Sequence, residues 1–142
     1  MNQQLALIAL VIDDYNRAIK YYTEVLAFKL LEDTKLSETK RWVVVSPDGT
    51  GTCSILLARA VGTEQESCIG NQSGGRVFLF LHTDNFQRDY DRLANLNVEF
   101  IRAPAIEEHG KVAVFKDLYG HLWDLIQPKQ YSKKHYSLNY FG

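Results

Sequence analysis

The sequence has few cysteines, no strong excess of charge and no long apolar run. Two cysteines, Cys53 and Cys68, are too few for a disulfide framework, so we expect a reducing compartment, the cytoplasm. The 16 basic and 17 acidic residues give a net charge of −1, which lacks the basic excess typical of nucleic-acid-binding proteins. No apolar stretch approaches the roughly 20 residues that a membrane-spanning helix needs. The sequence therefore predicts neither a nucleic-acid partner nor a membrane partner.

The motifs of several catalytic classes are also missing. The chain has no nucleophile elbow, no phosphate-binding glycine loop and no zinc-type cysteine spacing. What is present is a chain of 142 residues, 46% of them apolar, which is enough for the core of one domain. We therefore predict a single domain over residues 1–142.

The apolar pattern occurs twice along the chain. In residues 5–58 an apolar strand precedes a capped amphipathic helix, and three further strands follow. Residues 77–128 have the same order of elements. Between them, residues 59–76 are polar and glycine-rich, as is typical of a linker. We predict an α+β fold of two βαβββ repeats, followed by a tail over residues 129–142.

Turn and cap residues of the two halves fall in step, which favours an internal duplication. The predicted helix caps are Asp13 or Asp14 in the first half and Asp84 in the second. Further matches pair Tyr15 with Phe86, Val45 with Val114, Asp48 with Asp117, Gly51 with Gly120 and Leu56 with Leu125. One helix covers only one face of a four-stranded sheet, so the other face must be covered by a partner copy or hold a ligand.

Four segments carry a resemblance to a known family, and they are LALIALVIDDYNRAIKYYTEVLAFKLLEDT, KRWVVVSPDG, GRVFLFLHTDNFQRDYDRL and GKVAVFKDLYGHLWDLIQP. Through these segments, residues 5–128 resemble the vicinal oxygen chelate superfamily of glyoxalases, bleomycin resistance proteins and extradiol dioxygenases. The resemblance implies curled mixed sheets around a cup, helices on the outside, a small organic ligand and a homodimer. It does not fix the reaction, because the superfamily includes isomerases, dioxygenases, thiol transferases and proteins that only sequester drugs.

The metal enzymes of this superfamily place His, Glu or Gln at four symmetric positions. By resemblance, these positions are Leu7, Ile55, Phe78 and Asp124. Three of them are apolar and cannot bind a metal, so we expect a degraded metal site and no cofactor. A register shift of one residue would replace Ile55 by Leu56 and would change nothing. The alternative is a displaced divalent-metal site made from Asp124, His82 and a loop histidine.

Strand alternation predicts which side chains line the cup. The candidate ligand-binding residues are mainly apolar or aromatic, and they are Leu7, Trp42, Ile55, Phe78, Phe80, His82, Phe100, Arg102, Leu122 and Asp124. Such a surface suits a flat, partly apolar ligand. Glu108 and His109, in an expected loop over residues 105–110, are candidates for acid–base catalysis.

Three functions fit these observations. We favour a metal-poor module that binds a small organic molecule. The alternatives are a metal-dependent lyase, isomerase or dioxygenase that uses Asp124 and His82, and a structural dimer without a ligand. The tail contains Tyr131, Tyr136, Tyr140 and Phe141, and we expect so aromatic a segment to pack on the domain or on a second subunit.

Overall fold

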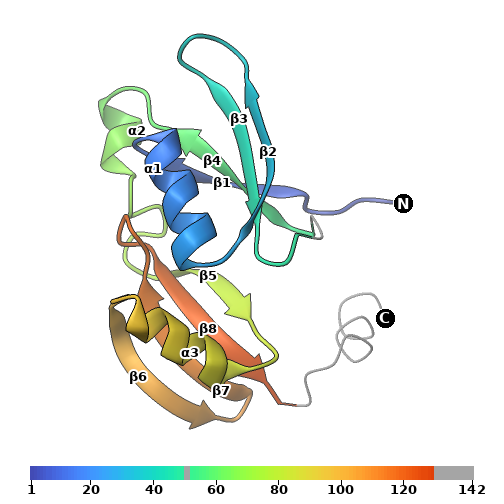
Figure 1. The fold of residues 1–142 in the computed structure, drawn as a ribbon, viewed down its shortest axis with the longest axis vertical. Coiled ribbons are helices and arrows are strands. Elements are labelled where there is room, and N and C mark those ends of the chain that lie inside the picture. Colours follow the sequence, from blue (N-terminus) through green and yellow to red (C-terminus); the bar gives the residue numbers. More distant parts are fainter. Residues whose placement is uncertain (50–51, 130–142) are drawn as a thin grey trace. The chain divides into compact units, whose positions relative to one another are not determined.

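The computed structural model describes residues 1–49 and 52–129, and the chain divides into two compact units, Met1–Gln72 and Ser73–Gly142. Each unit holds one four-stranded sheet and one main helix (Figure 1). The boundary between the units lies inside the predicted linker, residues 59–76. The aromatic tail residues, for which we predicted packing, lie outside the described residues.

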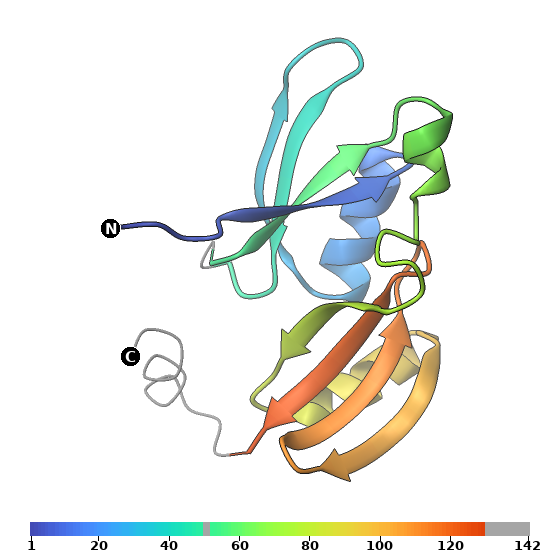
Figure 2. The same cartoon turned by 180° about the vertical axis from the view of Figure 1, so that it is seen from behind.

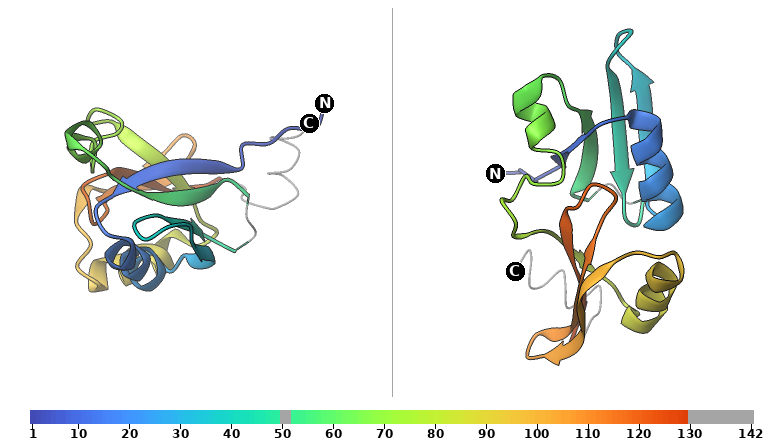
Figure 3. Two further views of the ribbon diagram at one scale, coloured as in Figure 1. Left: turned by 90° about the horizontal axis from the view of Figure 1, so that it is seen from above. Right: turned by 90° about the vertical axis from the view of Figure 1, so that its left-hand side faces the viewer.

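The first unit follows the predicted order of strand, helix and three strands. Its elements are β1 (Leu7–Ile12), α1 (Tyr15–Lys20) with a π-helical turn (Tyr21–Val25), β2 (Lys29–Lys35), β3 (Arg41–Ser46) and β4 (Ser54–Arg59). The strand order is β1-β4-β3-β2, with β1 parallel to β4. Helix α1 packs on β3 and β4 and leaves the other sheet face open (Figure 3).

The second unit repeats this arrangement. A short helix, α2 (Thr63–Ser67), precedes it in the linker, and its own elements are β5 (Val77–His82), α3 (Phe86–Asn95), β6 (Phe100–Glu107), β7 (Gly110–Lys116) and β8 (Leu122–Pro128). The strand order β5-β8-β7-β6, with β5 parallel to β8, is equivalent to that of the first sheet. The predicted α+β fold of two βαβββ repeats is therefore confirmed.

The two main helices begin at equivalent residues. The carboxylate of Asp14 accepts a hydrogen bond from the Arg17 backbone N–H at 2.8 Å and caps α1. In the second unit the cap is Asn85, which accepts from the Arg88 N–H at 3.1 Å. The prediction that Asp84 caps this helix was therefore wrong by one residue, and the Asp84 carboxylate instead pairs with the guanidinium of Arg88.

A β-bulge recurs at the same place in both units. Pairing shifts between Leu30 and Glu32 in β2, and it shifts between Phe100 and Arg102 in β6. Leu30 lies opposite Val45, and Phe100 lies opposite Phe115. The structure thus makes Val45 equivalent to Phe115, which corrects the predicted match of Val45 with Val114.

The strand pairing also corrects the predicted match between the last strands of the two units, β4 and β8. Leu56 lies opposite Val44, as Asp124 lies opposite Val114, so Leu56 and not Ile55 is the counterpart of Asp124. The predicted match of Leu56 with Leu125 was wrong for the same reason. The connection between β3 and β4, residues 47–53, is two residues longer than the connection between β7 and β8, residues 117–121, and this difference in length shifts the alignment of the last strands.

The free edge of β1 is paired by a side chain. The Gln72 amide accepts from the Val11 N–H at 2.7 Å and donates to the Ala9 carbonyl at 3.1 Å, as a neighbouring strand would. We expect Gln72→Ala to lower the free energy of unfolding by about 1–2 kcal/mol and to speed amide exchange at Val11. Urea unfolding and hydrogen exchange measure both effects.

The matched control for this prediction is Gln3→Ala, in the exposed N-terminal segment, which should leave both quantities unchanged. Equal stability of the Gln72→Ala variant and the wild type would contradict the role assigned to Gln72.

Candidate functional site

The sheet of the second unit has two chemically different faces. Trp123, Leu125 and Phe115 are buried on the face that packs against α3. Because side chains alternate along a strand, Asp124 points to the opposite, open face. Figure 2 shows each sheet from this open side.

Four residues form one row across the open face of the second sheet. Phe80 lies opposite Asp124, Asp124 opposite Val114, and Val114 opposite Arg102. The Phe80 side chain is 63% exposed, although it is a large aromatic residue on a regular strand. The row therefore places an aromatic ring, a carboxylate and a guanidinium on one surface.

The neighbouring positions supply an apolar floor. His82 lies opposite Ile126, and Ile126 lies opposite Val112, so these side chains share the face of Asp124. Leu122 lies two residues before Asp124 on the same face. Val112 and Val114 were missing from the predicted set, although alternation along β7 away from the core residue Phe115 could have identified them.

Electrostatic interactions link the polar groups of this face. Burial raises the pKa of Asp124, and His109, Arg102 and His82 lower it in part. Burial lowers the pKa of His82, and the Asp124 carboxylate raises it in part. At neutral pH the face therefore holds a half-buried carboxylate near an uncharged imidazole and an exposed guanidinium.

Glu108 and His109 occupy the turn between β6 and β7. The expected loop over residues 105–110 is shorter than predicted, because β6 continues to Glu107, which pairs with Gly110. Both side chains are exposed at this turn. His109 lies close enough to lower the pKa of Asp124, and the catalytic role of both residues stays a prediction.

Two predicted cup residues lie on the helix side of their sheets. The bulge turns Phe100 toward α3, where the centre of its ring lies 4.5 Å from that of the Tyr90 ring. Arg102 lies on the open face, opposite Val114. Ile55 is 5% exposed and occupies the position equivalent to the core residue Trp123. Ile55 is a core residue and Phe100 is half-buried on the helix side, so their assignment to the open face was wrong.

Phe78 lies in a second irregularity of the sheet. Pairing shifts between Val77 and Leu79, so Val77 lies opposite Leu122, as Leu7 lies opposite Ser54. Val77 thus takes the pairing position equivalent to Leu7, and the Phe78 ring lies 5.3 Å from the His121 ring. The residue that corresponds to Leu7 is therefore Val77 and not Phe78, and Val77 is also apolar.

The open face of the first sheet carries an equivalent row without an ionisable group at its centre. Ala9, Leu56, Val44 and Glu32 lie opposite one another in that order. Leu7 and Trp42, both predicted cup residues, are half-buried and lie on this face by alternation from Ala9 and Val44. This face is consequently more apolar than that of the second unit.

The four positions that hold the metal in the superfamily's enzymes carry one carboxylate and three apolar side chains in this chain. Leu7, Leu56 and Val77 offer no ligand atom, and only Asp124 carries a carboxylate. Within residues 1–49 and 52–129, no three His, Cys, Asp or Glu side chains lie close enough together to hold one metal ion. The residues at the expected positions do not fit a divalent metal.

Comparison with known proteins gives the family. Residues 4–125 match the model of the Glyoxalase/Bleomycin resistance protein/Dioxygenase superfamily. The chain belongs to this superfamily. An uncharacterized protein of Shewanella frigidimarina (strain NCIMB 400) is 56% identical over 128 residues, which cover 89% of this chain and 95% of that protein.

Two solved structures share the fold of this chain. The crystal structure of UcmS2 is 26% identical with a TM-score of 0.76, and the match covers 89% of this chain and 98% of that chain. TnmS3, an antibiotic binding protein from Streptomyces sp. CB03234, is 28% identical with a TM-score of 0.72, and the match covers 90% of this chain and 98% of that chain.

Among the described residues of the present chain, no helix has the length and apolar character needed to cross a membrane.

Proposed function

We propose that this protein binds a small, partly aromatic organic molecule on the open face of the β5–β8 sheet, without the divalent metal of the superfamily's enzymes. The observation that carries the proposal is Phe80, a 63% exposed ring beside a half-buried carboxylate on a face with an apolar floor. Stacking on an aromatic ring and burial of apolar area both favour a flat ligand.

The polar groups of this face would orient the ligand. Asp124 and His82 lie in adjacent rows and offer a carboxylate and an imidazole, while Arg102 offers guanidinium donors at the end of the row. A few polar groups on an apolar surface are typical of small-molecule sites. The antibiotic-binding neighbour TnmS3 supports the same class of ligand.

Removal of the Phe80 ring should weaken binding with little effect on folding. We expect Phe80→Ala to raise the Kd of an aromatic ligand about fivefold or more, because the stacked ring supplies about 1 kcal/mol or more of the interaction. Thermal-shift screening of tetracycline, doxorubicin and bleomycin identifies a ligand, and fluorescence titration then gives its Kd. The matched control is Ile106→Ala, which removes an apolar side chain that is 82% exposed and lies off the open face.

Metal analysis separates this proposal from the enzyme alternative. The purified protein should bind its ligand equally well before and after treatment with a chelator. Stoichiometric zinc, nickel, manganese or iron that is lost in both Asp124→Ala and His82→Ala would instead support a displaced metal site and a lyase, isomerase or dioxygenase reaction. Homodimer formation and a cytoplasmic location stay predictions from the sequence.

A further inference from the structure

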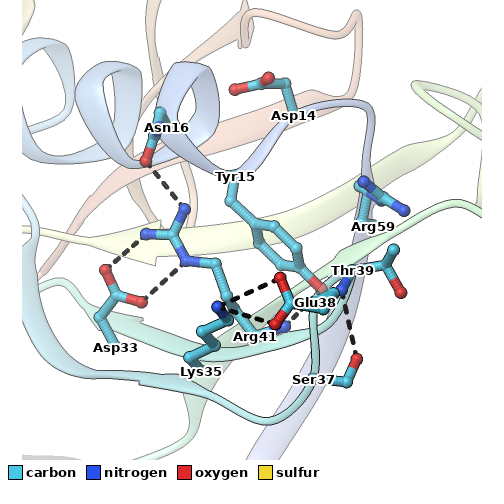
Figure 4. A pocket seen from close by; sticks show the side chains of 10 residues that line it. All are labelled: Asp14, Tyr15, Asn16, Asp33, Lys35, Ser37, Glu38, Thr39, Arg41 and Arg59. Atoms are coloured by element: carbon cyan, nitrogen blue, oxygen red, sulfur yellow. Dashed lines mark hydrogen bonds and ion pairs between the residues drawn. The ribbon is translucent and has the colours of Figure 1, made fainter.

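A second cavity lies in the first unit, on the helix side of its sheet. Its volume is about 410 Å³, and it is lined by the start of α1, the β2–β3 hairpin and the end of β4 (Figure 4). This volume lies in the range of small-molecule sites, about 300–1,000 Å³. Ionisable and polar side chains form almost all of the lining, in contrast to the apolar open face of the other unit.

One wall of the cavity is fixed by Arg41. Its Nε and Nη2 donate to the two carboxylate oxygens of Asp33 at 3.0 and 2.6 Å, and its Nη1 donates to Asn16 Oδ1 at 2.9 Å. The guanidinium also lies 5.2 Å from the centre of the Tyr15 ring. Arg41 and Asp33 thus neutralise each other in a rigid bidentate pair, which forms a preorganised wall.

Two opposite charges of the lining, Arg59 and Asp14, take part in no salt bridge within the described residues. Among the described residues, Arg59 makes no hydrogen bond or ion pair through its guanidinium, and Asp14 makes no ion pair. Asp14 Oδ1 caps α1, which leaves Oδ2 available as an acceptor. Arg59 lies opposite Ile12, whose side chain is buried on the helix side of the sheet, so Arg59 points toward α1.

We propose that this cavity binds a small zwitterion of the α-amino-acid type, with the carboxylate on Arg59 and the ammonium on Asp14. A guanidinium can hold a carboxylate through two parallel hydrogen bonds. The hydroxyl of Thr39 lines the same cavity and makes no hydrogen bond within the described part of the chain, so it offers a further donor. In the view of Figure 4 the Tyr15 ring lies between Arg41 and Arg59.

A simple anion or cation would satisfy only half of this site. An anion bound to Arg59 would share the cavity with the Asp14 carboxylate, and a cation bound to Asp14 would lie near the Arg41 guanidinium, whose pKa the Asp14 carboxylate helps to raise. A zwitterion places each charge next to its opposite. The site uses no residue of the open face of the second unit, so it is independent of the function proposed above.

An NMR titration tests the proposal. The free L-amino acids are added one at a time to ¹⁵N-labelled protein, and at least one should shift the backbone amides of residues 14–16, 33–41 and 59, with saturation at about millimolar concentration. Arg59→Gln and Asp14→Asn should each raise the Kd at least about tenfold. Asn is as good a helix cap as Asp, so Asp14→Asn keeps α1 intact while removing the charge.

Matched controls distinguish recognition from nonspecific charge effects. Arg76→Gln makes the same change at an exposed arginine outside the cavity and should bind as the wild type does. N-acetylated and amidated forms of the same amino acid should each bind more weakly than the free form. Arg59→Gln should leave the Phe80-dependent binding of an aromatic ligand unchanged.

Three results would overturn the proposal. These are the absence of localised shifts with every amino acid, equal binding by the N-acetylated form, and the same shifts produced by inorganic phosphate alone.

Discussion

Replacing Asp117 by alanine is expected to lower the free energy of unfolding by about 3–4 kcal/mol, because the change leaves several buried donors without an acceptor. The Asp117 side chain lies in the turn before β8 and is buried. Its Oδ1 accepts from the backbone N–H groups of Tyr119, Gly120 and His121 at 3.0–3.1 Å, and its Oδ2 accepts from the Trp123 indole at 2.9 Å. The carboxylate therefore joins the turn to the largest core side chain of the second unit.

The internal repeat supplies a control for this substitution. Asp48 occupies the matching turn of the first unit, but its side chain is exposed, whereas that of Asp117 is buried. Asp48→Ala should cost less than about 1 kcal/mol. Urea unfolding followed by far-ultraviolet circular dichroism measures both variants without relying on Trp123 fluorescence.

Asp117→Asn tests the mechanism of the loss. The amide oxygen can still accept the three backbone N–H groups, while the amide nitrogen faces the donor of the Trp123 indole. We expect a cost of about 1–2 kcal/mol, between those of Asp48→Ala and Asp117→Ala. Equal costs for Asp48→Ala and Asp117→Ala would contradict the role given to the buried carboxylate.

The repeat could be predicted from the sequence because caps and turns use a small set of residue types. Asp14 at a helix start, and Asp48 and Asp117 in matching turns, have recognisable chemistry at fixed spacing. The order of strands and helices followed from apolar periodicity. These signals are local, and they fixed the fold class and the approximate bounds of each repeat.

The side-chain faces could be predicted only in part. A bulge adds one residue to a strand and reverses the faces beyond it, and no residue type marks it. Arg102 and Phe80 lie on the open face, as alternation predicted, whereas the bulge at Ile101 turns Phe100 to the helix side of the sheet. Ile55 was misplaced because the alignment of β4 with β8 was off by one residue.

The cavity around Arg59 was not predicted from the sequence. Asp14, Asp33, Arg41 and Arg59 are separated along the chain and belong to no motif, so each one looks like an ordinary surface charge. Only the pairing of β4 with β1, which places Arg59 opposite Ile12, brings the last of them to the start of α1. Tertiary structure and not local pattern assembles this site.

Acidic pH should destabilise the second unit through its buried histidines. The His121 side chain is 2% exposed, and neither ring nitrogen makes a hydrogen bond with the described residues. Burial lowers the pKa of His121, although the Asp117 carboxylate raises it in part. Burial also lowers the pKa of His82, which is half-buried on the open face. Both imidazoles are therefore neutral in the folded protein at a pH where the unfolded chain protonates them.

The sign of the effect follows from proton binding. Below a pH of about 6.5 the unfolded state binds more protons than the folded state, so the free energy of unfolding decreases as the pH falls. The slope is at most about 1.4 kcal/mol per pH unit for each histidine, and the decrease ends below the folded pKa values. Asp124 acts in the opposite sense, because burial raises its pKa above 3.8, so its protonation returns some stability at lower pH.

Unfolding by urea between pH 8 and pH 5 should show this decrease, and His121→Phe should reduce its slope. The phenylalanine keeps an aromatic ring beside Phe78 but cannot be protonated. At pH 8 its stability should lie within about 1.5 kcal/mol of the wild type, because the volume change is small. An unchanged slope in His121→Phe would assign the acid sensitivity to His82 and would show that the buried imidazole at position 121 is not its cause.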